Sequence, residues 1–257
     1  MTTYRDIYSF ISEKFPRTLS SSWDNDGLMV CPNIDKVAKK VLISLDVTAK
    51  VAEYAKENGF DLILSHHPLV FKPIRQLSCE SPNSKIATNL FASGISVMSF
   101  HTRFDAGEGG MNDVLSAKLG LKVVGKFGED GDDLGRICEL DKAIPFSSLC
   151  NLVKDKLGTP NLFAVPWKKE IKKVAILGGG GGSYIESAAK AGADALITGS
   201  VSYNALLDAD QIGISVIAAG HYYTEEVFCD AMKELLQAHF SDIKIEISPV
   251  GCEVIYI

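Results

Sequence analysis

The chain has 257 residues, 46% of them hydrophobic, which is enough to bury one large core or two smaller ones without disulfides. The net charge of −6 argues against non-specific binding to nucleic acid, which depends on neutralising phosphates with Lys and Arg. The six cysteines are scattered and form no CxxC pair, which excludes a zinc finger or a thioredoxin-like site and favours free thiols in a reducing compartment. No stretch resembles a signal peptide or approaches the roughly 20 apolar residues that span a bilayer, so we expect a cytoplasmic protein without a membrane partner.

Apolar runs typical of buried strands alternate with amphipathic stretches typical of helices. In the first half, the pattern predicts strands at residues 41–46, 62–65 and 95–100 and helices at residues 48–58, 84–93 and 112–118. In the second half, it predicts strands at residues 136–140, 161–165, 174–177, 194–198 and 214–219 and helices at residues 146–157, 184–191, 203–208 and 224–237. A last strand is predicted at residues 244–247, at residues 253–257, or at both. The alternation of strand and helix predicts an α/β fold with largely parallel sheets.

A change of composition suggests where the chain divides. Residues 125–135 are rich in glycine and acidic residues, a composition typical of a loop or a domain boundary. We therefore expect two α/β lobes, an N-terminal one over residues 1–125 and a C-terminal one over residues 126–257.

Four of the five histidines directly follow predicted strands. His66 and His67 come after the strand at residues 62–65, His101 after the strand at residues 95–100, and His221 after the strand at residues 214–219. In open α/β sheets, ligands bind at the carboxyl ends of the strands. Imidazoles gathered there with carboxylates are typical ligands of zinc, iron or manganese. The pattern therefore predicts a metal centre.

Two carboxylates strengthen this interpretation. Asp105 follows His101, and Glu225 follows His221, each at a spacing of four residues. If a helix begins just after each strand, each pair shares one helical face. Imidazoles joined by bridging carboxylates are how two-metal hydrolases hold their ions. The fifth histidine, His239, fits no such pattern and is expected on the surface.

Two further features allow more than one interpretation. Residues Gly178–Gly182 lie between a predicted strand and a predicted helix, where their amides could bind a phosphate or simply form a tight turn. Arg103 lies between His101 and Asp105 and suits either an anionic substrate, through paired hydrogen bonds, or a surface salt bridge. The segment from Trp23 to Gly27 has the composition of a structural turn.

Several segments together carry a resemblance to a known family, and they occur in that family's order. They are Trp23-Asp-Asn-Asp-Gly27, Ser65-His-His-Pro-Leu69, His101-Thr-Arg-Phe-Asp105, Gly109-Gly-Met-Asn-Asp113, Gly135-Arg-Ile, residues 174–182, Ile197-Thr-Gly199 and Gly220-His-Tyr-Tyr-Thr-Glu225. On these residues the chain resembles the NIF-three-like family, whose members are commonly described as GTP cyclohydrolase I type 2 homologues.

The resemblance implies a dinuclear centre of zinc, iron or manganese and a particular fold. Its ligands would be His66, His67, Asp105, His221 and Glu225, with His101 beside them as a catalytic or supporting group. The implied fold has two similar α/β lobes with the metals in the cleft between them, and six chains would form a ring-shaped homohexamer. The chain departs from the family pattern at Arg103, Ser200 and Asn204; none is an implied metal ligand, so the departures bear on the substrate.

The implied activity is that of a metal-dependent hydrolase of a nucleotide-like substrate, with GTP cyclohydrolysis as the first candidate and His101 as the group that transfers protons. Phosphoester hydrolysis would use the same apparatus. A different class of function stays open as well, a non-enzymatic regulatory or interaction protein in which the metals serve structure or delivery.

Overall fold

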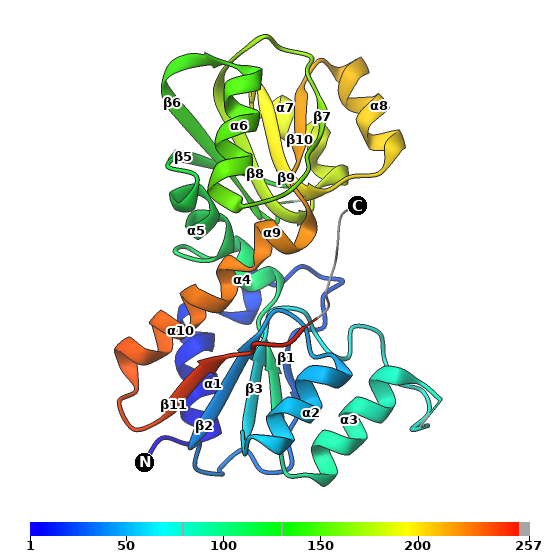
Figure 1. Cartoon of the computed structure of the whole chain (residues 1–257), viewed down its shortest axis with the longest axis vertical. Helices are drawn as coiled ribbons and strands as arrows, with labels where there is room; N and C mark the ends of the chain where they lie inside the picture. Colours follow the sequence, from blue (N-terminus) through cyan, green and yellow to red (C-terminus); the bar gives the residue numbers. More distant parts are fainter. Residues whose placement is uncertain (79, 130, 252–257) are drawn as a thin grey trace. The chain divides into compact units, whose positions relative to one another are not determined.

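The computed structural model describes residues 1–78, 80–129 and 131–251, and it divides the chain into two compact units (Figure 1). The first unit comprises Met1–Phe104 and the stretch that begins at Phe228. The second comprises Asp105–Val227. Each unit is built around one β-sheet, which confirms the predicted α/β fold.

The first unit contains a five-stranded sheet of order β1-β4-β3-β2-β11. Its strands are β1 (Gly27–Val30), β2 (Lys40–Ser44), β3 (Leu62–Ser65), β4 (Ser96–Ser99) and β11 (Lys244–Ile247). All neighbours are parallel except β1, which runs antiparallel to β4. The central strands carry unbroken apolar runs because both faces of the sheet are covered. Ser44, Ser65 and Ser99 lie opposite one another in register, so the chain leaves β2, β3 and β4 at one edge.

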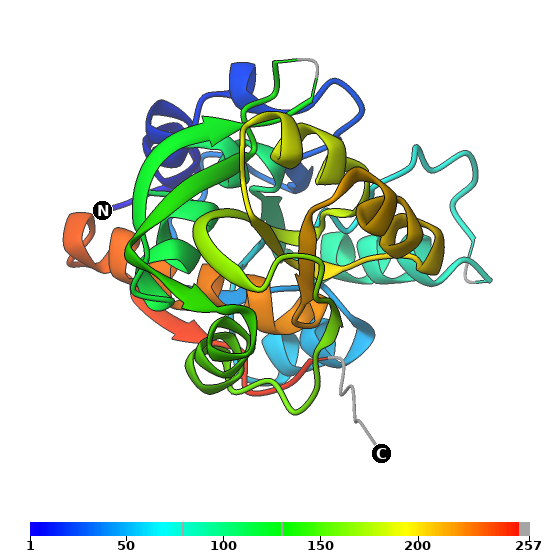
Figure 2. The same cartoon turned by 90° about the horizontal axis from the view of Figure 1, so that it is seen from above.

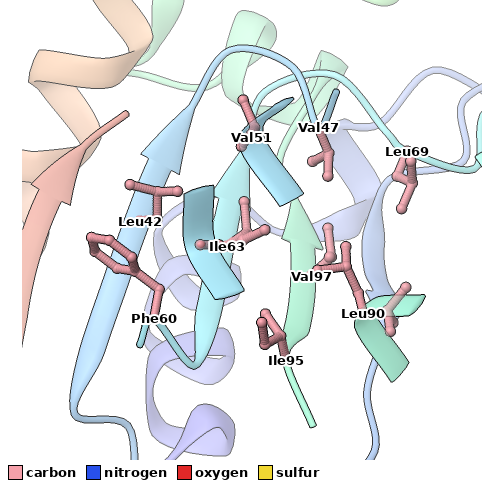
Figure 3. Close-up of a cluster of buried hydrophobic side chains, with 11 residues drawn as sticks. Leu42, Val47, Val51, Phe60, Ile63, Leu69, Leu90, Ile95 and Val97 are labelled. Carbon is pink, nitrogen blue, oxygen red and sulfur yellow. The ribbon is translucent and has the colours of Figure 1, made fainter. Parts of the chain in front are cut away.

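Helices cover both faces of this sheet. The helices of the unit are α1 (Tyr4–Lys14), η1 (Arg17–Leu19), α2 (Ala49–Glu57), α3 (Pro82–Ala92) and the greater part of α10 (Val227–His239). On one face, Val51 of α2 and Leu90 of α3 pack with the strand residues Leu42, Ile63 and Val97 in one buried cluster (Figure 3). On the other side, α1 and α10 contact each other, because Phe10 stacks on His239 at a ring-centroid distance of 3.9 Å.

The second unit contains a six-stranded sheet of order β5-β6-β8-β9-β10-β7. Its strands are β5 (Lys122–Phe127), β6 (Gly135–Pro145), β7 (Phe163–Val165), β8 (Glu170–Gly180), β9 (Ala195–Ser200) and β10 (Ser215–Ala218). Only the centre, β8-β9-β10, is parallel; β5, β6 and β7 add antiparallel pairings at the two sides. The expectation of a largely parallel sheet is therefore wrong for this unit, because strands without a crossover helix flank the βαβαβ core.

The helices of the second unit precede, connect or follow these strands. They are α5 (Met111–Lys118), α6 (Phe146–Leu157), η2 (Gly182–Tyr184), α7 (Ile185–Lys190), α8 (Tyr203–Ile212) and α9 (His221–Glu225). The crossover helices α7 and α8 lie side by side (Figure 2). The short helix α4 (Thr102–Ala106) contains the point at which the chain passes from the first unit to the second.

The structure divides the chain at other positions than the sequence suggested. The predicted boundary near residue 125 falls inside β5, and the chain instead changes unit at Phe104/Asp105 and again at Val227/Phe228. Helix α5 belongs to the second unit, where Asn112 Oδ1 accepts a hydrogen bond of 2.8 Å from the Gly178 amide of β8. Strand β11 returns to the first unit and pairs with β2.

Most predicted elements are present, but some elements of the described chain were not foreseen. Helix α1, the short helix η1 and strands β1 and β5 were absent from the prediction, and β5 takes the first residues of the expected loop at residues 125–135. The expected strand at residues 244–247 is β11, whereas the alternative at residues 253–257 lies outside the described residues. Within the described part of the chain, no helix is both long enough and apolar enough to cross a bilayer.

Candidate metal centre

Three imidazoles lie together at the edge where β3 and β4 of the first unit end. His66 and His67 directly follow β3, and His101 follows β4 by two residues. One ring nitrogen of each lies within 4.8 Å of the others. The ring centroids are 4.9 Å apart for His66 and His67, 5.1 Å for His66 and His101, and 5.5 Å for His67 and His101. The grouping predicted from the strand ends is confirmed within this unit.

A separate oxygen holds the Nδ1 atom of each of these rings. For His66 the oxygen is the Phe100 carbonyl at 3.0 Å, and for His67 it is Asp46 Oδ1 at 2.8 Å. For His101 it is Asp24 Oδ1 at 2.9 Å. Carbonyl and carboxylate oxygens only accept hydrogen bonds, so Nδ1 must carry the proton in each ring. The neutral form of each imidazole therefore has its lone pair on Nε2, the atom that can bind a metal ion or accept a proton.

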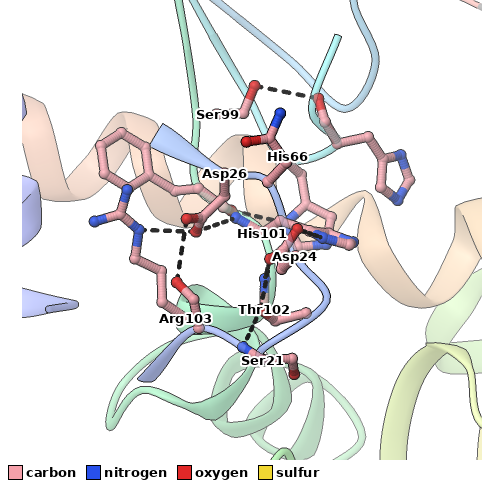
Figure 4. A network of polar contacts seen from close by, with 12 residues as sticks. Ser21, Asp24, Asp26, His66, Ser99, His101, Thr102 and Arg103 are labelled. Atoms are coloured by element: carbon pink, nitrogen blue, oxygen red, sulfur yellow. Dashed lines mark hydrogen bonds and ion pairs between the residues drawn. The ribbon is translucent and has the colours of Figure 1, made fainter. Parts of the chain in front are cut away.

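Asp24 is the buried support of His101 (Figure 4). Its side chain is fully buried, and its Oδ2 accepts hydrogen bonds from the amide of Thr102 at 3.0 Å and from the hydroxyl of the same residue. Burial by itself raises the pKa of this carboxyl, but the hydrogen bonds from His101 and Thr102 outweigh it and hold the pKa below its ordinary value. Asp24 is therefore ionised at neutral pH and fixes the direction of the His101 ring.

A second carboxylate of the same turn, Asp26, supports the site through Arg103. Both side chains are fully buried, and Arg103 Nε donates to Asp26 Oδ2 at 2.8 Å. The guanidinium lies over the Phe100 ring at 4.5 Å, and the His101 amide donates to Asp26 Oδ2 at 3.4 Å. The idea of a surface salt bridge is wrong, because the ion pair is buried. That Arg103 also binds substrate stays a prediction.

In the second unit, His221 and Glu225 form a pair on helix α9. The helix begins at His221, directly after β10 and the turn at Gly220, so the predicted spacing places both side chains on one face. His221 Nε2 lies 3.0 Å from Glu225 Oε2, and His221 Nδ1 lies 3.2 Å from the Ser200 hydroxyl. Glu225 is 4% exposed, whereas the His221 side chain is 45% exposed.

Glycines allow the strands of the second sheet to approach this helix closely. A Cβ on Gly199 would lie 2.6 Å from the Gly179 carbonyl oxygen and 2.8 Å from His221 Cα. The Gly179 amide donates to Thr224 Oγ1 at 3.1 Å, and the Gly178 amide donates to Asn112. Two amides of the glycine run thus already donate hydrogen bonds to protein side chains. This supports the interpretation of the run as a close-packed turn rather than a phosphate site.

Asp105 and His239 complete the set of predicted residues. Asp105 lies in α4, which begins at Thr102, so His101 lies just before the helix rather than within it as the predicted pairing required. The Asp105 backbone carbonyl accepts from Asn112 Nδ2 at 3.3 Å. Asp105 is the first residue of the second unit. Glu225 lies near the other end of this unit, two residues before Val227, after which the chain returns to the first unit. His239 is exposed, as predicted.

Asp24, Asp26 and Asp46 are parts of the site that were not predicted from the sequence. The segment Trp23–Gly27 has the composition of a structural turn, yet β1 pairs antiparallel with β4, which brings the start of β1 to the end of β4 and places Asp24 and Asp26 beside His101. One feature of the sequence could have pointed to Asp46. It lies two residues after β2, and the ends of β2 and β3 lie side by side in the sheet.

Comparison with known proteins places these residues in a described family. The family model Duf34/NIF3 (NGG1p interacting factor 3) matches residues 2–253. A Clostridium perfringens protein named GTP cyclohydrolase 1 type 2 homolog is 33% identical over 249 residues, 95% of each chain. A Helicobacter pylori protein named GTP cyclohydrolase 1 type 2 is 33% identical over 247 residues, 96% of each chain.

Solved structures show the same fold. The crystal structure of a Staphylococcus aureus hypothetical protein superposes with a TM-score of 0.88 at 26% identity and covers 99% of each chain. Reduced HcgD from Methanocaldococcus jannaschii superposes with a TM-score of 0.84 at 28% identity, covering 97% of this chain and 98% of that one.

Proposed function

This chain belongs to the Duf34/NIF3 family, and we propose that it is a metal-dependent hydrolase of a nucleotide, with GTP as the first candidate substrate. One observation carries the proposal. Three imidazoles converge at a sheet edge, and a protein oxygen holds each Nδ1, so that all three can present Nε2 to a shared point. Any buried imidazole needs an acceptor for its N–H, but three imidazoles with ring nitrogens within 4.8 Å of one another are typical of metal ligands or proton-transfer groups.

We propose that two divalent ions bind per chain, held by His66, His67, Asp105, His221 and Glu225. Imidazole nitrogen and carboxylate oxygen are the donors that zinc, iron and manganese accept, so the residues present fit such ions. When bound, a divalent ion of this kind supplies Lewis-acid chemistry: it acidifies water and polarises the bond that is attacked. His66 and His67 belong to the first unit and Asp105, His221 and Glu225 to the second, so both units supply ligands in this proposal.

His101 is the proposed proton-transfer residue. Asp24 holds its Nδ1 proton, so Nε2 of the neutral ring accepts a proton and the resulting imidazolium is stabilised by the buried carboxylate. The His101 side chain is 15% exposed, which leaves the ring accessible to a small molecule. Asp24 positions the ring, and Asp26 with Arg103 positions the backbone that carries it.

The names of the relatives suggest the substrate. A protein of which this chain covers nearly the whole length is named GTP cyclohydrolase 1 type 2, and opening a purine ring requires water activation together with proton transfer. A homohexamer acting in the cytoplasm is the matching proposal for assembly and location, and light scattering of the purified protein tests the hexamer.

Metal analysis and a nucleotide assay test the proposal together. His67→Ala and His221→Ala should each lower the metal content sharply, whereas His239→Ala, an exposed histidine outside the site, should leave it unchanged. Full metal occupancy in the double variant His67→Ala/His221→Ala would overturn the ligand assignment.

Turnover is then compared between metal-loaded wild type, metal-loaded His101→Ala and a chelated sample. Loss of the purine absorbance indicates ring opening, and release of inorganic phosphate from the same panel indicates phosphoester hydrolysis instead. If wild type hydrolyses nothing above the chelated control, the hydrolase proposal fails and a non-enzymatic metal-binding role replaces it.

A further inference from the structure

Two large aromatic side chains lie exposed beside His101. Trp23 is 56% exposed and Phe71 is 42% exposed, and their ring centroids are 6.0 Å apart at an interplanar angle of 59°. Both rings also meet the imidazole of His101 edge-on, at centroid distances of 6.1 Å for Trp23 and 6.3 Å for Phe71. Adjacent exposed aromatic rings at the side of a polar site are typical of a surface that binds a ligand.

The backbone on both sides of this pair is held by hydrogen bonds. Trp23 precedes Asp24, whose carboxylate is bound to His101 and Thr102. The next residue, Asn25, donates from Nδ2 to the carbonyl of Val70, and this ties the Trp23 segment to the residue directly before Phe71. The two rings therefore belong to segments that are held in place by hydrogen bonds and tied to each other. Binding a ligand against them costs little conformational entropy of the protein.

We propose that Trp23 and Phe71 form a stacking surface for the planar ring of the substrate, a purine base. The inference rests on the proposed function and adds which part of the substrate is held and by which residues. The two rings are tilted and too close together to admit a base between them, so the base stacks on the outer face of one ring and meets the edge of the other. The contact of both rings with His101 places the base beside the group proposed to transfer protons.

A neighbouring cavity suits the phosphates of a nucleotide. A cavity of about 730 Å³ is lined by Phe71 together with Lys72 and Arg75, whose side chains are exposed. Phe71 belongs to both the stacking surface and the cavity, so a base on the ring has two cations within the adjoining space. Arg and Lys are residues that bind phosphate groups, Arg through paired hydrogen bonds and Lys as a compact charge.

Tryptophan fluorescence offers a direct test. The chain has two tryptophans, so the variant Trp167→Phe leaves Trp23 as the sole emitter, and Trp167 lies in the second unit, outside the proposed site. Guanosine and GTP should quench the emission of this metal-loaded variant, whereas inorganic triphosphate, which has no base, should not. The Kd of Trp167→Phe for both ligands, measured by calorimetry, should equal that of wild type.

Substitutions distinguish the contribution of the base to binding affinity from that of the phosphates. Trp23→Ala should raise the Kd for guanosine and GTP alike, about 5- to 100-fold, while Trp23→Phe should keep most of the affinity. Phe71→Ala should act in the same direction. Lys72→Ala/Arg75→Ala should weaken GTP and inorganic triphosphate but leave guanosine unchanged. Metal content and circular dichroism, unchanged in Trp23→Ala, would show that the loss is local.

The outcomes distinguish this inference from the hydrolase proposal. Binding of guanosine that depends on Trp23, without any turnover, supports the stacking surface and contradicts the hydrolase. Turnover of GTP by Trp23→Ala with an unchanged KM contradicts the stacking surface and leaves the hydrolase standing. An unchanged Kd for guanosine in both Trp23→Ala and Phe71→Ala likewise overturns the inference.

Discussion

The candidate ligands in the two units are held in different ways. In the first unit, His66, His67 and His101 each have Nδ1 fixed by an oxygen that can only accept, and two of these oxygens belong to carboxylates. In the second unit, His221 Nδ1 meets the Ser200 hydroxyl, which can donate or accept, while its Nε2 lies beside Glu225, another proposed ligand, and the side chain is far more exposed. The second group owes its geometry instead to glycines that let the sheet approach helix α9.

The difference shows two ways to prepare a site. Carboxylate acceptors set both the direction and the tautomer of a ring, which prepares it to bind a metal before the metal arrives. Close backbone packing fixes where helix α9 lies, while the Nδ1 atom of its histidine meets a hydroxyl rather than a carboxylate or carbonyl. Three variants, each with a matched control, separate these contributions.

The largest effect is expected from breaking the buried ion pair of the first unit. Arg103→Ala removes the buried cation that pairs with the fully buried Asp26 carboxylate and leaves it only Arg17, at 3.6 Å, as a charged partner. The variant should lower the free energy of unfolding by about 3–5 kcal/mol. Its control is Arg5→Ala, which removes an exposed ion pair with Asp35 and should leave stability nearly unchanged. Urea denaturation measures both.

The same variant decides whether Arg103 also meets the substrate. Normal stability of Arg103→Ala combined with a raised KM for an anionic substrate would favour substrate binding over the positioning role. If Arg103→Ala does not fold, Arg103→Lys, which keeps the charge but loses the planar guanidinium over Phe100, should lose less stability than Arg103→Ala.

A smaller loss is expected from breaking the close packing of the second unit. A methyl group on Gly199 would meet backbone atoms of Gly179 and His221 at less than 3 Å, so Gly199→Ala should cost about 1–3 kcal/mol and lower metal content as α9 shifts. Gly125→Ala is the matched control, since Gly125 also lies in a strand but its Cβ would meet only Ile137, at 3.9 Å. Equal melting temperatures for the two variants would contradict the close-packing explanation.

The smallest effect comes from removing the acceptors themselves. Asp46→Ala leaves the His67 ring without its carboxylate, and we expect metal affinity to fall about 10- to 100-fold. Ser200→Ala removes only the weaker hydroxyl partner of His221 and should change the affinity less. Competition with a chromophoric chelator measures both metal affinities. A larger loss of metal affinity in Ser200→Ala than in Asp46→Ala would contradict the conclusion that carboxylate acceptors prepare the first unit more strongly than the hydroxyl prepares the second.

Local patterns in the sequence were sufficient for much of the fold. The apolar runs at residues 62–65 and 214–219 are β3 and β10, and helices begin directly after β4 and β10, as the spacing of His221 and Glu225 required. These features depend on residues within a few positions of one another, because backbone hydrogen bonds and side-chain periodicity set them.

The remaining features depend on contacts between segments that lie far apart in the sequence. The local pattern predicts which residues end the strands and therefore that three histidines gather at one sheet edge. It did not determine that β1 inserts antiparallel beside β4, and this pairing is what brings Asp24 to His101 and Asp26 to Arg103. Nor did it determine that β11 returns to the first sheet and α5 joins the second. Strand order and long-range pairing follow from how whole faces are buried, which no short stretch of sequence specifies.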